Sequence, residues 1–511
     1  MRALLSSAVK STEEHIDMEK PKDASGACCD ERDKAKPAAS AAAPLSRESD
    51  GDGLPKRQRM IILAVMLIGT GTACISQSMM ISALPAVMHE FNVNASLGQL
   101  ITTSYIFTLG LISALTAFLI NRFETRPLFF AAMGTFVAGC ALSLAASNYP
   151  LLLLSRLVQA GGAGILLPLL QVVALSVYPK SEYGRAMGVA GLTIGFAPAI
   201  GPTISGIIID AWGWRAVFVC LGAVAILCAI AAFFLLTDVV KRSKDHGRLD
   251  VASALLYAGG FCLVLVGATF MEESGQASLL AIALLALGAI VLAVFARRQL
   301  HVENPFLKLS CFRDRTFAVS TMLVVFAHIS FMAPSIMVPL FVQDIQGQSA
   351  AVSGLVILPG AVLLGILNPV TGRLLDKHGP RPLLLVGGAL IVAGTLAFAA
   401  CTEAVPEWLV TMLYGVRIVG IACIMMPMTG HACTTLPPED LPQGTAIITS
   451  FRQIIGSIST SVLITVMSVF SSNALGVDVH GFSVSFLVQA AVIAVGIVLG
   501  MLLLPRKRVG K

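Results

Sequence analysis

The chain has 511 residues, of which 56% are hydrophobic and 13% charged, and its formal net charge is +6. A typical soluble domain has about 25% charged residues, so the composition excludes a chain folded entirely in water and favours a membrane protein. Its eleven cysteines are scattered and form no Cys/His cluster with metal-ligand spacing, so we expect no metal site and no cofactor.

Residues 1–59 differ from the rest of the chain because they are polar and mix acidic with basic side chains. They contain no apolar stretch of the length that a signal peptide needs. We therefore expect a disordered cytoplasmic tail, with Met18 as a second candidate for the first residue of the protein.

Fourteen apolar segments follow, each about long enough to cross a bilayer. The predicted fold class is an all-α polytopic membrane protein, with a six-helix bundle in 60–240, two extra helices in 241–300, a second six-helix bundle in 301–505 and a basic end at 506–511. Two such halves suggest a pseudo-twofold axis normal to the membrane, about which transporters rock around a central site. The segments are 60–86, 97–120, 128–147, 150–177, 186–209, 215–237, 250–271, 277–296, 316–341, 349–370, 383–401, 407–433, 443–471 and 481–504.

Basic residues predict the orientation of these helices. With the N-terminus inside, the outer turns carry a single Lys or Arg, Arg215. We therefore place both termini in the cytoplasm and attribute the positive net charge to membrane insertion, not to a nucleic-acid partner. The loops on the cytoplasmic side are rich in basic residues, among them Lys241, Arg242, Lys244, Arg248, Arg297, Arg298, Lys377, Arg506, Lys507 and Arg508.

Two related strings follow the second helix of each half: TAFLINRFETRPLFF at 116–130 and TGRLLDKHGPRPLLL at 371–385. In the second string we expect Gly372 where two helices meet closely, and Asp376 near a helix N-terminus and paired with Arg381. Such a loop would latch two helices in one state of a rocking cycle. The alternative is an ordinary basic loop.

The first string lacks two of these residues. Ala117 stands at the position of Gly372, and Asn121 at that of Asp376. We therefore predict that only the latch of the C-terminal half is complete.

Three arginines lie within predicted helices. Arg156 and Gln159, in RLVQAGGAG, are three residues apart and share a helix face. Arg417 occupies the equivalent place in the second half, and Arg452 lies in SFRQIIGS. An arginine within a span usually faces a cavity or a partner, although its side chain can also extend to the membrane interface.

The string GFAPAIGPTISG, at 195–206, has small residues every four positions: Ala197, Gly201 and Ser205. Such a face lets two helices approach closely. The string also contains Pro198, Pro202 and Gly206. Because the two prolines remove backbone donors, we expect a kink.

These motifs resemble a known family. The second loop string fits GxLxDxxGxR, the signature of the major facilitator superfamily, and the resemblance covers residues 60–505. The 6 + 2 + 6 pattern resembles its EmrB/QacA drug:proton antiporter branch, and the strings at 116–130 and 195–206 look most like lincomycin-resistance-type exporters. The matching loop residues are Gly372, Leu374, Asp376, Gly379 and Arg381.

The resemblance implies a fourteen-helix exporter fold, drugs as substrates and protons as the coupling ion. It implies that GFAPAIGPTISG is the antiporter motif, although Ala197 and Ser205 stand where glycine is usual. It also links Arg156 to proton coupling.

The resemblance further implies an acidic residue in the first helix, before the ALP of ISQSMMISALP at 75–85. The candidates here are Ser76 and Gln77, and neither titrates. His328, near the middle of the ninth helix, has an ordinary pKa near 6.5 that suits a proton carrier, or it is a neutral, hydrogen-bonded histidine; His431 is expected at the interface. The acidic residues near the spans lie at helix ends: Asp210, Asp238, Asp250, Glu272 and Glu273.

We predict a monomeric secondary transporter of the bacterial cell membrane that exports amphipathic drugs or related compounds by alternating access, coupled to protons. The candidate residues for substrate and coupling are Gln77, Arg156, Gln159, His328, Arg417 and Arg452. Methionines could line the cavity, with core packing as the alternative for each: Met79, Met80, Met332, Met337, Met425, Met426 and Met428. The alternatives are an importer or uniporter of the same fold, a membrane enzyme, for which no nucleophile–base pair is visible, and a sensor.

Overall fold

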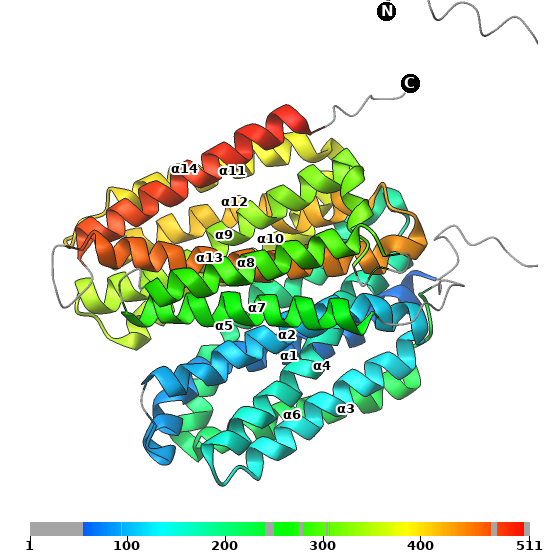
Figure 1. Cartoon of the computed structure of the whole chain (residues 1–511), viewed down its shortest axis with the longest axis horizontal. Helices are drawn as coiled ribbons and strands as arrows, with labels where there is room; N and C mark the ends of the chain where they lie inside the picture. Colours follow the sequence, from blue (N-terminus) through cyan, green and yellow to red (C-terminus); the bar gives the residue numbers. More distant parts are fainter. Residues whose placement is uncertain are drawn as a thin grey trace, which may run out of the picture. The chain divides into compact units, whose positions relative to one another are not determined.

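The computed structural model describes residues 55–93, 95–240, 250–274, 279–302, 305, 307–471 and 478–504. These residues form fourteen α-helices and no strand, and most of the predicted N-terminal tail lies outside them (Figure 1). The first helix begins at Lys56, so residues 56–59 belong to a helix and not to the tail as predicted.

The N-terminal half consists of six helices. They are α1 (Lys56–Phe91), α2 (Ala95–Arg122), α3 (Thr125–Leu144), α4 (Tyr149–Val177), α5 (Tyr183–Trp212) and α6 (Trp214–Leu235), with the short η1 (Lys180–Glu182) before α5.

Two further helices, α7 (Val251–Ser274) and α8 (Leu279–Gln299), precede the C-terminal half. That half contains α9 (Arg315–Leu340), α10 (Ala350–His378), α11 (Pro380–Ala399), α12 (Glu407–Cys433), α13 (Leu441–Val469) and α14 (Val479–Leu503). Its short turns are η2 (Leu309–Arg313), η3 (Phe341–Ile345) and η4 (Pro438–Asp440).

Within the described residues, twelve helices are long and apolar enough to cross a membrane; α5 and α7 are not among the twelve. The all-helical fold class is therefore confirmed, and the fourteen α-helices are compatible with the predicted fourteen spans. Most helices extend a few residues beyond their predicted apolar segments, because a helix continues through the polar residues that flank its membrane-spanning part.

Polar residues begin several of these helices. The side chains of Asn148, Asp314, Ser349 and Asp478 each accept a hydrogen bond from a backbone N–H in the first turn of α4, α9, α10 and α14, respectively. Such caps satisfy donors that have no partner within the helix. Short connections can therefore reverse the chain between neighbouring helices.

The two halves meet mainly where α5 packs along α10 and α2 packs along α13, and α12 also contacts α5 and α4 contacts α13. Figure 1 shows the helices of the N-terminal half in blue to teal and those of the C-terminal half in yellow to red on opposite sides of this junction. Residues that lie on α5 and α10 therefore decide how the halves contact each other.

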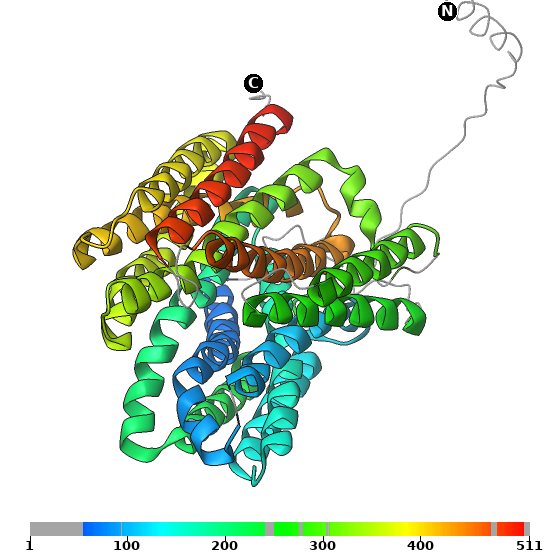
Figure 2. The same cartoon turned by 60° about the vertical axis from the view of Figure 1, so that its left-hand side comes forward.

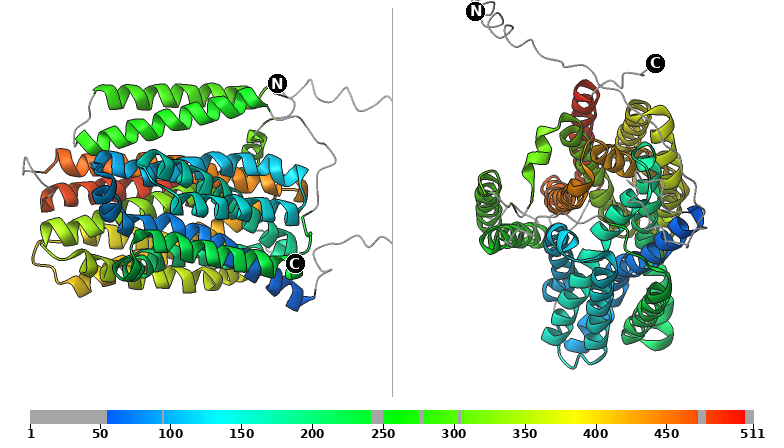
Figure 3. Two further views of the ribbon diagram at one scale, coloured as in Figure 1. Left: turned by 90° about the horizontal axis from the view of Figure 1, so that it is seen from below. Right: turned by 90° about the vertical axis from the view of Figure 1, so that its right-hand side faces the viewer.

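The pair α7 and α8 lies beside this junction and outside both bundles (Figures 2 and 3). It packs against α2 and α13, and the Tyr257 hydroxyl donates to the Gly110 carbonyl of α2 over 3.4 Å. Arg298 joins the two helices through Asp250, with Nε 3.1 Å from Oδ2. The extra pair thus contacts one helix of each half.

Candidate functional site

The loop after α10 reaches the other half of the molecule through Asp376. Its Oδ1 accepts from the Gly184 N–H and its Oδ2 from the Arg185 N–H, each over 2.8 Å. Both donors lie in the first turn of α5, where unpaired N–H groups and the helix dipole favour a negative charge. Asp376 thus lies at a helix N-terminus as predicted, and that helix belongs to the opposite half. Arg381 donates to the Leu504 carbonyl just after α14.

Next to Asp376, glycines bring the backbones of α5 and α10 into contact over several helical turns. A Cβ on Gly372 would overlap the Gly184 carbonyl oxygen, and one on Gly188 would overlap that of Asn368. The Asn368 amide donates to the Gly191 carbonyl over 2.8 Å. From Gly184 to Gly195, this contact extends over about 16 Å of helix at 1.5 Å per residue.

We call this contact the α5–α10 seam. It consists of Gly184, Gly188, Gly191 and Gly195 on α5 and of Gly365, Asn368, Gly372 and Asp376 on α10. Gly372 and Asp376 were predicted from the sequence, whereas the four glycines of α5 were not. Their spacing of three or four residues, one helix face, is the signal that could have found them.

Further contacts hold the halves together beside the seam. Lys180, before α5, donates to the Leu436 carbonyl over 3.1 Å, and a Cβ on Gly430 of α12 would meet the backbone of Tyr183. At the turn into α11, Gly379 has φ 78°, a conformation that favours glycine. The halves are therefore closed against each other at the end that is predicted to face the cytoplasm.

Arg156 of α4 is fully buried in the N-terminal half. Its Nη1 donates to Ser76 Oγ of α1 over 3.0 Å and to Gln159 Oε1 over 2.6 Å, and its guanidinium lies 4.2 Å from the centroid of the Tyr105 ring. The Gln159 amide in turn donates to Ser143 Oγ over 2.9 Å. The side chain does not extend to the membrane interface, which was the alternative interpretation.

Arg417 of α12 occupies the equivalent place in the C-terminal half. Its Nε donates to Thr395 Oγ1 over 3.0 Å, and its Nη2 donates to the Ser330 carbonyl and to Gln489 Oε1, each over 3.0 Å. A Cβ on Gly394 would overlap its side chain, as one on Gly139 would overlap Gln159. Each half thus buries an arginine of its fourth helix, which donates to a serine of the first helix: Ser76 in α1 and Ser330 in α9.

Arg452 and His328 form a third buried group, between α13 and α9. Arg452 is 3% exposed and His328 is 4% exposed. Within the described residues, neither ring nitrogen of His328 has a hydrogen-bond partner, and neither do Nε and Nη1 of Arg452. The positive charge of Arg452 interacts electrostatically with His328 and with Cys74 of α1. The hydrogen-bonded histidine that we considered is therefore not what the structure shows.

The remaining predicted residues lie in different surroundings. Gln77 is half-buried on α1, whereas its neighbour Ser76 is the residue that contacts Arg156. A Cβ on Gly201 of α5 would overlap Ser78 of α1, which confirms a close helix contact, but one on Gly206 would meet nothing within 4 Å. The side chain of Pro202 lies outside the described residues.

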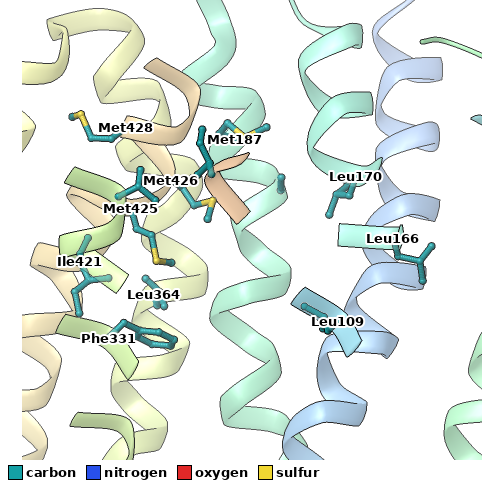
Figure 4. Close-up of a cluster of buried hydrophobic side chains, with 14 of the residues drawn as sticks. Leu109, Leu166, Leu170, Met187, Phe331, Leu364, Ile421, Met425, Met426 and Met428 are labelled. Atoms are coloured by element: carbon teal, nitrogen blue, oxygen red, sulfur yellow. The ribbon is translucent and has the colours of Figure 1, made fainter. Parts of the chain in front are cut away.

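Six of the seven predicted cavity methionines are buried, and Met332 is partly buried. Figure 4 shows Met425, Met426 and Met428 of α12 in an apolar cluster with Met187 of α5. A Cβ on Gly191 would meet the Met426 side chain, so this methionine lies at the α5–α10 seam.

Comparison with known proteins places the chain in a family. A sequence model of the Major Facilitator Superfamily matches residues 66–460. The chain belongs to this superfamily. It is therefore a multi-pass membrane transporter that takes small-molecule substrates, and the predicted family and fold are confirmed.

Several superfamily relatives align over most of their length. The chain is 36% identical over 450 residues to the uncharacterized MFS-type transporter YcnB of Bacillus subtilis, covering 87% of this chain and 95% of YcnB. It is 32% identical over 421 residues to the lincomycin resistance protein LmrB of Listeria monocytogenes, covering 82% and 89%. The solved proton:xylose symporter XylE shares the fold, with a TM-score of 0.64 at 13% identity over 88% of this chain and 96% of XylE.

Two hollows on this superfamily member lie away from the buried arginines. One of about 450 Å³ is lined by Arg126, Asp238 and neighbours, and an adjoining one of about 510 Å³ is apolar. Both share Phe130 of α3 and Phe233 of α6, helices at the edge of the N-terminal half opposite the C-terminal half (Figure 1). Neither is a candidate for the transport site between the halves.

Proposed function

We propose that this transporter exports amphipathic drugs or related small molecules across the cytoplasmic membrane by alternating access, with protons as the coupling ion. The observation that carries the proposal is the α5–α10 seam. It closes one end of the junction through backbone contacts and the Asp376 carboxylate. These contacts can all separate at once when the two halves rock as rigid bodies.

The direction of transport and the orientation rest on two further arguments. Basic residues predict that both termini and the latch loops lie in the cytoplasm. We propose that the protein acts as a monomer in the cell membrane of a bacterium. The motif at 195–206 supports export, because Gly201 makes the close helix contact expected of it. The relatives that are named for lincomycin and multidrug resistance support drugs as the substrate class.

The coupling step needs a group that gains and loses a proton within the membrane. Among the described residues, every buried charged side chain is an arginine and none is a carboxylate. We propose that His328 carries the proton, with Arg452 of α13 as the charged group that acts beside it. One charge that crosses 100 mV supplies about 2.3 kcal/mol, or nearly fifty-fold in concentration.

We further propose supporting roles for two residues of the N-terminal half. Arg156 tunes the pathway, and the half-buried Gln77 contacts a polar part of the substrate. Because Ser76 bonds Arg156 directly, it is the position on α1 where a carboxylate would pair with that arginine.

The absence of a buried carboxylate from the described residues favours a second candidate, an importer or uniporter without proton coupling. One experiment separates the two. Purified protein in liposomes is given a panel of fluorescent amphipathic compounds, with and without a pH gradient. Antiport predicts accumulation against a concentration gradient only when the pH gradient is present. Equal flux in both conditions would establish uniport.

A further inference from the structure

The buried charges of this transporter have one sign. Arg156, Arg417 and Arg452 are each at most 3% exposed, and the described residues bury no Asp or Glu. A buried charge is strongly disfavoured unless a partner compensates it. The partner of each arginine therefore decides whether that arginine is part of the scaffold.

Two of the arginines are compensated within their own half. Arg156 donates to Ser76 and Gln159, and Arg417 donates to Thr395, Ser330 and Gln489. Both guanidinium groups also lie near aromatic rings. Neutral oxygens and rings surround them, and of their buried nitrogens only Arg156 Nε has no partner within the described residues, so both side chains are held within their own half.

Arg452 differs from them because two of its nitrogens, Nε and Nη1, are buried and unpartnered within the described part of the chain, against one nitrogen of Arg156 and none of Arg417. Buried donors without a partner are rare in proteins, and a bound ion, water or ligand is a common reason for them. A guanidinium donates strong, charge-assisted hydrogen bonds to a carboxylate, which makes such a group its best partner.

His328 of α9 packs against the face of α13 that carries Arg452. A Cβ on Gly456 would lie 2.8 Å from His328 Cδ2, and Gly456 follows Arg452 by four residues, one helical turn. Both ring nitrogens of His328 are unpartnered as well. Arginine and imidazole donors from α13 and α9 therefore adjoin, without an acceptor among the described residues.

We propose that Arg452 and His328 form the binding site for a carboxylate group of the transported compound, so that the substrates of this transporter are amphipathic organic anions. This inference rests on the proposed export function and adds the charge of the substrate. Arg452 supplies the fixed positive charge, and His328 supplies an additional hydrogen bond to the carboxylate.

The test uses purified full-length protein in lipid nanodiscs and two fluorescent probes, dansylglycine and its methyl ester. The two differ only in the carboxylate. We expect dansylglycine to bind at least about 10-fold more tightly than the ester, since a hydrogen bond to a charged group changes affinity by about 10- to 100-fold. Arg452→Gln should remove this preference, Arg452→Lys should keep part of it, and His328→Gln should reduce it less.

Arg297→Gln is the matched control, because it removes the same charge from an exposed position at the end of α8. It should leave the preference unchanged. Equal binding of both probes by the wild type, a comparison that needs no variant, would overturn the proposal, as would a preference that persists in Arg452→Gln.

The export function can fail independently of this site. Efflux of neutral or cationic compounds without any preference for the acid would leave export standing and overturn the anion site. Preferential binding of dansylglycine through Arg452, without efflux of any compound, would support the anion site and contradict export.

Discussion

The loops after the second helix of each half keep the same arginine but not the same carboxylate. Arg126 donates to the Phe233 carbonyl near the end of α6 over 2.7 Å, and Arg381 donates to the Leu504 carbonyl after α14 over 2.8 Å. Only the C-terminal loop has Asp376, which binds the start of α5 in the other half. The arginines hold each bundle together, and the carboxylate connects the two bundles.

The same division applies deeper in the membrane. Arg156 and Arg417 lie at equivalent places and each bond a serine of the first helix of their own half, whereas Arg452 and His328 belong to the C-terminal half alone. Residues that occur at equivalent places in both halves thus stabilise their own bundle. Of the residues that occur in the C-terminal half alone, Asp376 binds the other half, and Arg452 and His328 have hydrogen-bonding nitrogens without a partner within the described residues. Variants made in pairs, one in each half, can test this difference.

The largest expected effect comes from Gly372→Ala. A Cβ at this position overlaps the backbone of Gly184, which cannot move away without opening the seam. Overpacking costs about 1–3 kcal/mol, and backbone overlap lies at the upper end, so efflux should fall about 100-fold or more at matched expression. Ala117→Gly, at the equivalent place in the first loop, should have little effect. Near-normal efflux by Gly372→Ala would show that the seam is not tightly closed during transport.

Gly201→Leu should be nearly as harmful. Its side chain would overlap Ser78 where α5 meets α1, at a cost of about 1–3 kcal/mol, so efflux should be lost with partial retention of protein in the membrane. Gly206→Leu, on the same helix, meets open space and serves as the control. Full activity of Gly201→Leu would mean that this face lies against lipid.

Asp376→Asn should reduce efflux by about 5- to 30-fold. It removes the charge that the α5 N-terminus favours but keeps one acceptor, and loss of such a cap costs about 1–2 kcal/mol. Asn121→Asp, in the first loop, should change efflux little because the α5 latch is already complete. Small and equal effects at both positions would restore the interpretation as ordinary basic loops.

His328→Gln should cause a smaller change in rate, within about 10-fold, but should abolish the dependence of efflux on the pH gradient. The change to test in the N-terminal half is Gln77→Glu. It should strengthen that dependence if Gln77 occupies a coupling position of α1 that has lost its carboxylate in this chain. Efflux by His328→Gln with both rate and pH dependence retained would reduce the histidine to a packing residue.

The smallest effect is expected at the α7–α8 pair, which belongs to neither half. Arg298 and Ser253 lower the pKa of Asp250 from its ordinary value of 3.8 to about 2, so the charged carboxylate stabilises the fold. This stabilisation is complete above about pH 4 and is lost as the pH falls toward 2. Because Arg298 is 43% exposed, Asp250→Asn should cost less than about 1 kcal/mol. Thermal unfolding at pH 7 and pH 3 checks that the wild-type advantage shrinks at the lower pH.

Sequence alone predicted the bundles well, because apolar segments and basic loops report the membrane directly. It also identified Arg156, Gln159 and Arg417, since a charged residue in an apolar segment is conspicuous. It placed Asp376 at a helix N-terminus but did not identify the helix, because that helix lies in the other half.

Other features depend on packing between distant segments. Of Ser76 and Gln77 on α1, the sequence led us to choose Gln77 as the candidate, whereas the structure places Ser76 in contact with Arg156. It did not indicate that Arg452 lies beside His328, because α9 and α13 meet only in the folded bundle. Gly206 completes the motif at 195–206, but a Cβ there would meet nothing within 4 Å.

The central claim is that the two halves separate along the α5–α10 seam during transport, and the distance across the seam tests it most directly. Spin labels at Ser181→Cys and Lys377→Cys, both exposed beside Asp376, report this distance by pulsed electron resonance once the native cysteines are replaced. We expect transport-active protein to show two distances between the labels, a short one and a long one, and Asp376→Asn to enlarge the population with the long distance. A single short distance, unchanged by Asp376→Asn and by transported compounds in active protein, would contradict it.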